Sequence, residues 1–434
     1  MGRYPCSTMQ HRISSADIAK ITSLLVTAAI MLLANGLQGT LVPIRGHLEG
    51  FSDTTLSLQG FAYFAGFMAG CLCCPFLVAR SGHIRSFAIL TALTTGAVLL
   101  MPLIVGAWSW AILRVGIGFC AAGMYSIIEG WLNQQAPNEK RGRIFTMYAA
   151  INNLALLGGQ YLFTLGDRQG DVRFMGCAIL TVFCLIPIGF TQQSEPHRVA
   201  LPKLRVVQLF KVSPVGVVGA AIVGLASGAF WILAPVYADY RGLTGDGVAL
   251  FMSMVILGGA LAQWPLGRLS DFTDRRFVIG CAAAGAAFAG IMLAIPVPFG
   301  IDPRYWLLGA AFLYGVSAFP IGSLTNAHLN DHAKREEMTE TAASNLFVYG
   351  AAAMIGPLIA AVVIHVGGLS AVFYYTATMH STLLLFVIYR VLVRAPVKSE
   401  EGGVFGVATT QGPGAVHFAP APDSVETTEI KKAS

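Results

Sequence analysis

Long apolar runs dominate this chain of 434 residues, and they restrict its fold more than any single motif does. A helix needs about 20 apolar residues to cross the hydrocarbon core of a bilayer. Only helices and closed barrels satisfy their backbone hydrogen bonds there, and these runs are far too long for barrel strands. The sequence therefore predicts an all-α membrane protein with twelve transmembrane helices, over residues 21–42, 56–78, 87–105, 109–131, 144–165, 174–191, 214–237, 247–269, 277–297, 304–325, 344–366 and 370–393.

The placement of charge predicts the orientation of these helices. Only 12% of the residues are charged, against roughly 25% in an average soluble domain. Basic residues gather in every even-numbered connection between the predicted spans: Arg80, His83 and Arg85; Lys140, Arg141 and Arg143; Arg198, Lys203, Arg205 and Lys211; Arg268, Arg275 and Arg276; Lys334 and Arg335. Cytoplasmic loops carry an excess of Lys and Arg, so we expect both termini in the cytoplasm. Because membrane spans separate these cations, a nucleic-acid-binding face is excluded.

A glycine and proline pattern recurs in the two halves of the chain. The segments 35–43 and 227–235 share a glycine at the second position and a proline at the last. Three aligned glycine pairs mark the repeat: Gly36 with Gly228, Gly66 with Gly258 and, after a small insertion, Gly159 with Gly356. Internal duplication of membrane helices is typical of secondary transporters. Glycines inside the spans also allow neighbouring helix backbones to approach closely.

The repeat and the composition together predict the domain organisation. A long basic connection that contains prolines separates the halves. The last segment is polar and rich in glycine and proline, which is typical of disorder. The expected units are a six-helix bundle over 1–191, a cytoplasmic linker at 192–213, a second six-helix bundle over 214–393 and a disordered cytoplasmic tail at 394–434.

The end of the eighth predicted span carries a charged motif. Residues 263–276 contain a glycine, Asp271 four positions after it, and the basic pair Arg275-Arg276. This pattern resembles the cytoplasmic loop motif of the major facilitator superfamily. The resemblance implies that Asp271 meets the N-terminus of the fifth span and helps latch one conformation, a contact worth about 0.3 to 1 kcal/mol. The corresponding position in the first half is Ala79, so we expect two unequal latches.

Two further motifs extend the resemblance. Arg114, followed by Gly118, is similar to the fourth-helix motif of the superfamily. Residues 128–133 and 141–145 are similar to the YcaD-type branch of its bacterial transporters. The resemblance implies two pseudo-symmetric six-helix bundles that rock about a central cavity, in the cytoplasmic (inner) membrane of a bacterium.

Ionisable residues inside the spans are functional candidates, because each costs about 2.5 to 3.5 kcal/mol on insertion scales. Arg114 can bind an anionic group or ease proton release from a nearby acid; the alternative is a structural role, holding backbone carbonyls or reaching outward. For Glu129 we expect a gating ion pair with Arg80 and Arg85, with a proton-coupling site and an interfacial anchor as alternatives. The predicted gating residues are Arg80, Arg85, Glu129, Asp271, Arg275 and Arg276.

Uncharged polar and aromatic side chains recur on helix faces that can meet a cavity, such as Gln59 and Tyr63 in the second span. Polar donors opposite aromatic walls suit a small amphipathic organic solute. The alternative is that the amides only tie helices together, at about 0.6 kcal/mol per bond. The helices that the resemblance places around the cavity give a candidate set of Asn35, Gln38, Arg114, Asn152, Gln160, Trp231, Asn345 and Tyr349.

These observations predict a secondary active transporter that exports a small organic solute by alternating access, coupled to protons and working as a monomer in the lipid bilayer. An uptake permease for a small metabolite and a non-transporting membrane sensor are the alternatives. The sequence has no Walker-type loop for ATP and no set of catalytic residues within the spans, so neither a primary pump nor an enzyme is expected. Cys71, Cys73 and Cys74 have no second ligand pair nearby, so we expect no metal and no cofactor.

Overall fold

The computed structural model describes residues 15–137, 140–165, 171–189, 204–333 and 338–393. Within these ranges the chain folds into helices and the turns that join them. The helices are α1 (Ser15–Leu48), α2 (Asp53–Ser81), α3 (His83–Leu100), α4 (Ala107–Gln135), α5 (Arg141–Thr164), α6 (Val172–Phe183), α7 (Leu185–Gly189), α8 (Val206–Val212), α9 (Pro214–Tyr240), α10 (Asp246–Phe272), α11 (Arg275–Ala294), α12 (Pro303–Asn330), α13 (Met338–Gly367) and α14 (Ala371–Val393).

The helices account for the twelve predicted spans. Eleven of the described helical segments are long and apolar enough to cross a membrane, and one of them, Val172–Gly189, is formed by α6 and α7 together. The fifth predicted span is α5, which has 24 residues and is therefore long enough to cross. It carries Asn152, Asn153 and Gln160, which make it the most polar of the twelve. The predicted all-α transmembrane architecture is confirmed.

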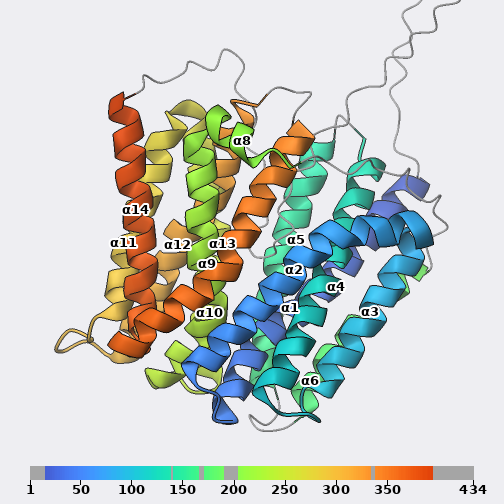
Figure 1. Cartoon of the computed structure of the whole chain (residues 1–434), viewed down its shortest axis with the longest axis horizontal. Coiled ribbons are helices and arrows are strands. Elements are labelled where there is room, and N and C mark those ends of the chain that lie inside the picture. Colours follow the sequence, from blue (N-terminus) through green and yellow to red (C-terminus); the bar gives the residue numbers. More distant parts are fainter. Residues whose placement is uncertain (1–14, 138–139, 166–170, 190–203, 334–337, 394–434) are drawn as a thin grey trace, which may run out of the picture.

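The helices form two bundles that lie next to each other (Figure 1). The first contains α1 to α7, and the second contains α9 to α14. In the first bundle α2 packs on α4 and α1 on α5, and in the second α10 packs on α12 and α9 on α13. The pairs of helices that pack together thus correspond between the halves. Of the predicted linker, α8 is described, whereas residues 190–203 and the predicted tail at 394–434 lie outside the described residues.

Glycines hold α2 and α4 in backbone contact. A Cβ atom on Gly66 would lie 1.9 Å from the carbonyl oxygen of Val115, and one on Gly118 would lie 2.0 Å from the carbonyl oxygen of Tyr63. No real side chain tolerates such distances. The two helices therefore cross with only glycine between their backbones, as small residues permit inside membranes.

The aligned glycines of the second half make the same contacts between α10 and α12. A Cβ atom on Gly258 would lie 2.3 Å from the Phe312 carbonyl oxygen, and one on Gly315 would lie 2.0 Å from the Val255 carbonyl oxygen. The other aligned pairs act likewise: Gly36 on Leu156 and Gly159 on Leu33 join α1 to α5, and Gly228 on Ala353 and Gly356 on Leu225 join α9 to α13. The repeated glycines of the sequence are thus the crossing points of the helices.

Contacts between the two bundles differ in kind. They join α2 to α13, α5 to α10 and α1 to α9. A Cβ atom on Gly60 would meet the side chains of Ile232 and Pro357 at 2.7 and 3.2 Å, and one on Gly350 would meet the sulfur atom of Met68 at 2.3 Å. Here a glycine faces side chains of the other bundle, not its backbone.

We expect Gly66→Ala and Gly118→Ala each to destabilise the protein by about 1 to 3 kcal/mol, because the added methyl group pushes two helix backbones apart. The thermal unfolding midpoint of the purified protein in detergent measures the loss. The matched control is Gly116→Ala on the same helix, where a Cβ atom would have nothing within 4 Å. Equal midpoints for the Gly116 and Gly118 variants would contradict the backbone contact.

Candidate functional site

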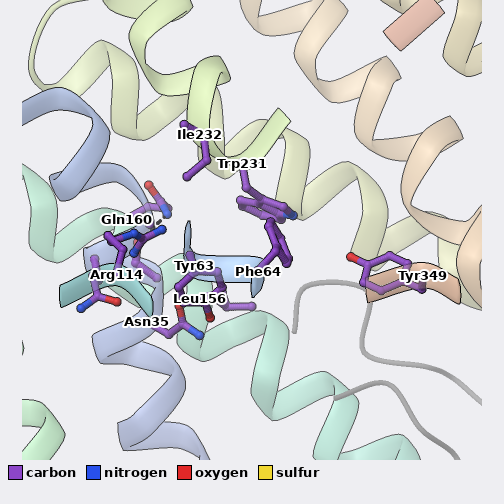
Figure 2. A pocket seen from close by; sticks show the side chains of 12 residues that line it. Asn35, Tyr63, Phe64, Arg114, Leu156, Gln160, Trp231, Ile232 and Tyr349 are labelled. Carbon is purple, nitrogen blue, oxygen red and sulfur yellow. Dashed lines mark hydrogen bonds between the residues drawn. The ribbon is translucent and has the colours of Figure 1, made fainter. Parts of the chain in front are cut away.

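A cavity of about 60 Å³ lies between the two bundles (Figure 2). Helices α1, α2, α4 and α5 contribute to it from the first bundle, and α9 and α13 from the second. Its lining consists of Asn35, Gly36, Gln38, Gly39, Tyr63, Phe64, Arg114, Leu156, Gln160, Trp231, Ile232 and Tyr349. Six of the residues predicted from sequence are among them: Asn35, Gln38, Arg114, Gln160, Trp231 and Tyr349.

The amides on the first-bundle side also tie helices together. The Asn35 Nδ2 group donates to the Tyr125 hydroxyl at 2.6 Å, which links α1 to α4. Gln160 donates from Nε2 to the Gly36 carbonyl at 2.9 Å and accepts at Oε1 from the Thr40 hydroxyl at 2.7 Å, which links α5 to α1. Asn35 and Gln160 thus both line the cavity and join neighbouring helices.

Arg114 is the charged residue of the lining. Its side chain is 5% exposed, and its guanidinium carbon lies 4.4 Å from the centroid of the Tyr63 ring. The Nε atom is buried and has no hydrogen-bond partner among the described residues. The alternative in which Arg114 holds backbone carbonyl groups is therefore not observed in the described part of the chain.

Aromatic side chains form much of the opposite wall. Trp231 packs edge-on against Phe230 and Phe319, at ring-centroid distances of 5.5 and 5.7 Å. The Tyr349 hydroxyl lies 3.1 Å from the Ser227 hydroxyl, which links α13 to α9. The amide and guanidinium groups of the lining thus all come from the first bundle, whereas its aromatic rings come from both bundles.

Two predicted cavity residues lie elsewhere. Asn152 is 2% exposed, and its Oδ1 atom has no hydrogen-bond partner in the described ranges. Asn345 donates from Nδ2 to Asn326 and joins α13 to α12. Both residues lie on helices that contribute to the cavity, α5 and α13, but neither is part of its lining. Of the second-span pair, Tyr63 lines the cavity, whereas Gln59 donates to the Ala107 carbonyl at 2.9 Å.

Three lining side chains were not predicted: Phe64, Leu156 and Ile232. They are apolar, and apolar residues are common on every face of these spans. The sequence contains one indirect signal for two of them: Phe64 directly follows Tyr63, and Ile232 directly follows Trp231, and both preceding residues are cavity candidates.

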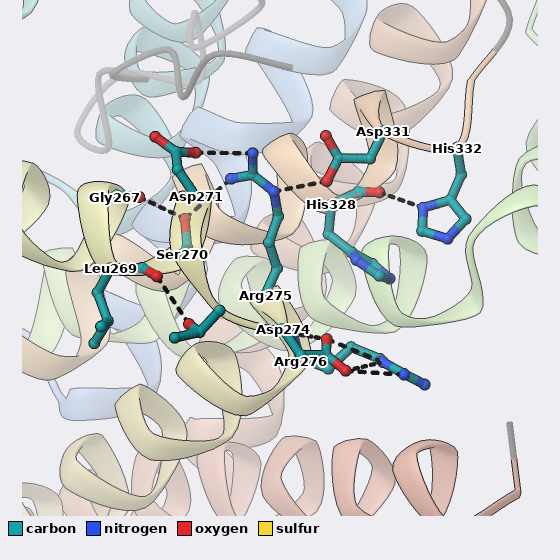
Figure 3. A network of polar contacts seen from close by, with 11 residues as sticks. Gly267, Leu269, Ser270, Asp271, Asp274, Arg275, Arg276, His328, Asp331 and His332 are labelled. Carbon is teal, nitrogen blue, oxygen red and sulfur yellow. Dashed lines mark hydrogen bonds and ion pairs between the residues drawn. The ribbon is translucent and has the colours of Figure 1, made fainter. Parts of the chain in front are cut away.

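A cluster of charged side chains surrounds Arg275 in the second bundle (Figure 3). Arg275 pairs with Asp271 at 2.9 Å and with Asp331 at 2.6 Å, and it donates to the Ser270 hydroxyl at 3.0 Å. These bonds tie the end of α10 to the start of α11 and the end of α12, all within the second bundle. The predicted contact of Asp271 with the start of α5 is not formed in the described residues, since the carboxylate is taken up by Arg275.

Asp274 caps the start of α11. Its Oδ1 atom accepts from the backbone and Nε of Arg276 at 2.9 and 3.2 Å, and its Oδ2 atom pairs with the Arg276 guanidinium at 2.9 Å. Burial alone would raise the pKa of Asp274, but the bonds from Arg276 outweigh it and hold the pKa below its usual range. For Asp331, burial raises the pKa above its usual range, although the charge of Arg275 opposes the shift.

Glu129 lies inside the first bundle with a different partner from the one predicted. Its side chain is 3% exposed and accepts a hydrogen bond from the Tyr148 hydroxyl at 3.3 Å, which joins α4 to α5. Arg80 and Arg85 are exposed. The predicted gating ion pair between Glu129 and these arginines is not formed in the described residues, because Glu129 points into the bundle.

Two bundles of membrane-spanning helices around a shared cavity define the class of secondary transporters. The family model of the Major Facilitator Superfamily matches residues 24–345 and 216–422. The chain therefore belongs to this superfamily.

Comparison with known proteins agrees at the level of sequence and of fold. The chain is 25% identical over 373 residues to the MFS-type transporter YcaD of Escherichia coli O139:H28, an alignment that covers 84% of this chain and 93% of YcaD. The YcaD protein of Shigella flexneri shows the same values. The resemblance predicted from short motifs is thus confirmed.

Among solved structures, the nucleoside transporter NupG superimposes with a TM-score of 0.71 at 11% sequence identity, covering 88% of this chain and 100% of that chain. The D-xylose-proton symporter gives a TM-score of 0.65 at 15% identity, covering 88% and 99%. At these identities the likeness shows the fold alone, with its two bundles.

We expect Asp274→Ala to cost about 0.5 to 2 kcal/mol, because it removes the cap of α11. Asp274→Asn keeps the cap oxygen and should cost less. The folded-state pKa of Asp274 lies below its ordinary value, so the stability that its charge adds is present above about pH 4 and is lost as the pH falls through the folded-state pKa. Thermal unfolding from about pH 6 to about pH 2.5 should show a wild-type advantage over Asp274→Asn that is constant above about pH 4 and shrinks below it; an advantage that grows with acid would contradict this.

Proposed function

We propose that the protein is a secondary active transporter that moves a small organic solute by alternating access. The observation that carries the proposal is the cavity whose lining comes from both bundles, since rocking of the bundles would open the same side chains to one side of the membrane and then to the other. The names of the structural neighbours, a nucleoside transporter and a proton symporter for D-xylose, are in keeping with a small solute and a proton. The direction that we propose is export.

The proposal of proton coupling is supported by a line of polar groups that leads from the cavity into the first bundle. Asn35 lines the cavity and bonds to Tyr125. One helical turn further along α4, on the same face, lies Glu129, which is buried with Tyr148 as its partner. A carboxyl group that is buried in one conformation and reached by water in another takes up and releases a proton between the two. We therefore propose Glu129 as the coupling group.

Transport is tested with the purified protein in liposomes. Thermal-shift screening with uridine, D-xylose, benzoate and indole-3-acetate first selects a ligand, and the radiolabelled compound is then followed under an imposed pH gradient, with export and uptake measured separately. We expect saturable flux against the concentration gradient of the solute that liposomes without protein do not show. A ligand that binds but does not cross would instead support the membrane sensor.

We expect Glu129→Gln to abolish flux driven by the pH gradient and to leave exchange of labelled for unlabelled solute at equal pH within about twofold of wild type. The amide keeps the shape of the side chain but carries no titratable proton. Glu49→Gln, at an exposed acid in the turn after α1, is the matched control and should retain gradient-driven flux. Wild-type gradient-driven flux in Glu129→Gln would rule out Glu129 as the coupling group, and equal loss of both kinds of flux would favour a gating role.

A further inference from the structure

The cavity carries a positive charge that its lining does not neutralise. None of the twelve residues that line it is acidic, whereas Arg114 is 5% exposed and its Nε atom is buried without a hydrogen-bond partner in the described residues. Its guanidinium carbon lies over the face of the Tyr63 ring, 4.4 Å from the ring centroid. An unpaired cation is unfavourable at a buried position between membrane-spanning helices, which implies that a ligand supplies what the chain does not.

The described acids of the first bundle lie away from Arg114. Glu129 lies on the same helix as Arg114, about 22 Å away at a rise of 1.5 Å per residue, and it bonds to Tyr148. Asp171 and Glu49 both pair with Arg45 at the end of α1. Asp53 is the first residue of α2, about 15 Å along that helix from Tyr63 at a rise of 1.5 Å per residue. None of these four acids is placed to neutralise Arg114.

The surroundings of Arg114 fit an anionic head group. A guanidinium group presents paired N–H donors that match the two oxygens of a carboxylate. Gln38, which also lines the cavity, forms no hydrogen bond within the described part of the chain, and its amide is a further donor. Aromatic rings complete the lining, Phe64 from the first bundle and Trp231 and Tyr349 from the second. Such rings stack on flat apolar bodies.

Resting on the transport function proposed above, we propose that the substrate is an organic anion, a carboxylate carried on a flat apolar body, and that Arg114 binds its charge. In this conformation the cavity volume of about 60 Å³ is too small for such a body, because a cavity that holds benzene has a volume of about 150 Å³. Binding of the whole substrate therefore goes with some separation of the bundles, while the head group occupies the space beside Arg114.

The first test compares acids with their uncharged amides on the wild-type protein, so it needs no variant. Indole-3-acetate and benzoate are titrated against indole-3-acetamide and benzamide, with the unfolding midpoint and the heat of binding as readouts. We expect at least one acid to bind at least tenfold more tightly than its amide, which is about 1.4 kcal/mol. Amides that bind as tightly as the acids, or no stabilisation by either acid, would overturn the proposal.

The second test changes the cation. Arg114→Gln should weaken binding of the preferred acid at least tenfold and leave that of its amide within twofold, and Arg114→Lys should fall between, since it keeps the charge and loses the paired donors. Arg268→Gln, an exposed arginine on α10, is the control and should bind as wild type. Wild-type affinity for the acid in Arg114→Gln would overturn the role of Arg114.

Flux in liposomes separates this proposal from the one on which it rests. If indole-3-acetate binds through Arg114 but does not cross the membrane, the transport function fails and the anion site stands. If uridine or D-xylose crosses at the same rate in wild type and in Arg114→Gln, and the acids do not cross, the transport function stands and the organic anion is ruled out.

Discussion

Direct contact between helix backbones is the constraint on which the rest of this structure depends. In a membrane, helices gain little from burying apolar side chains against one another, because lipid is equally apolar, and they associate through close packing instead. Here the aligned glycines provide that packing at equivalent crossings in both halves. The crossing of α1 with α5 also places Gly36 on the wall of the cavity. The same contact that holds the first bundle together therefore fixes the position of its polar lining.

The symmetry of this scaffold does not extend to its side chains. The repeat aligns Gln38 with Phe230 and Gly39 with Trp231. At these two positions the second bundle has aromatic side chains, whereas the first bundle has an amide and a glycine. The charged groups also differ between the halves, since Arg114 lines the cavity from the first bundle and the ion-pair network around Arg275 lies in the second. The two halves of the duplicated fold thus contribute different side chains to the cavity, with the amides and the guanidinium group in the first half only.

The sequence predicted the fold well because long apolar runs and repeated glycines are local signals, and the bilayer leaves a chain few ways to satisfy its backbone. It predicted the helices of the cavity and many of its polar residues for a similar reason. It failed where a partner had to be chosen. The sequence predicts that Glu129 pairs with Arg80 and Arg85, which lie in a neighbouring connection. The position of Glu129 on the face of α4 instead brings its carboxylate to the Tyr148 hydroxyl. The sequence predicts that Asn345 lines the cavity, but its amide donates a hydrogen bond to Asn326 on the neighbouring helix α12. Such contacts depend on the rotation of each helix about its own axis, which turns by about 100° per residue. The composition of the sequence does not determine this rotation.

The glycines at the boundary between the bundles have a separate consequence. Gly60 and Gly350 face Ile232, Pro357 and Met68 through side chains, and a thioether in particular bends and slides at little energetic cost. A substitution at an internal crossing collides with a backbone that cannot yield, so it endangers the fold. At this boundary the added bulk can be relieved by a small separation of the bundles, so its effect falls on the relative populations of the conformations. Changes at Gly60 and Gly350 would then adjust how long the molecule dwells in each state, while the scaffold itself stays intact.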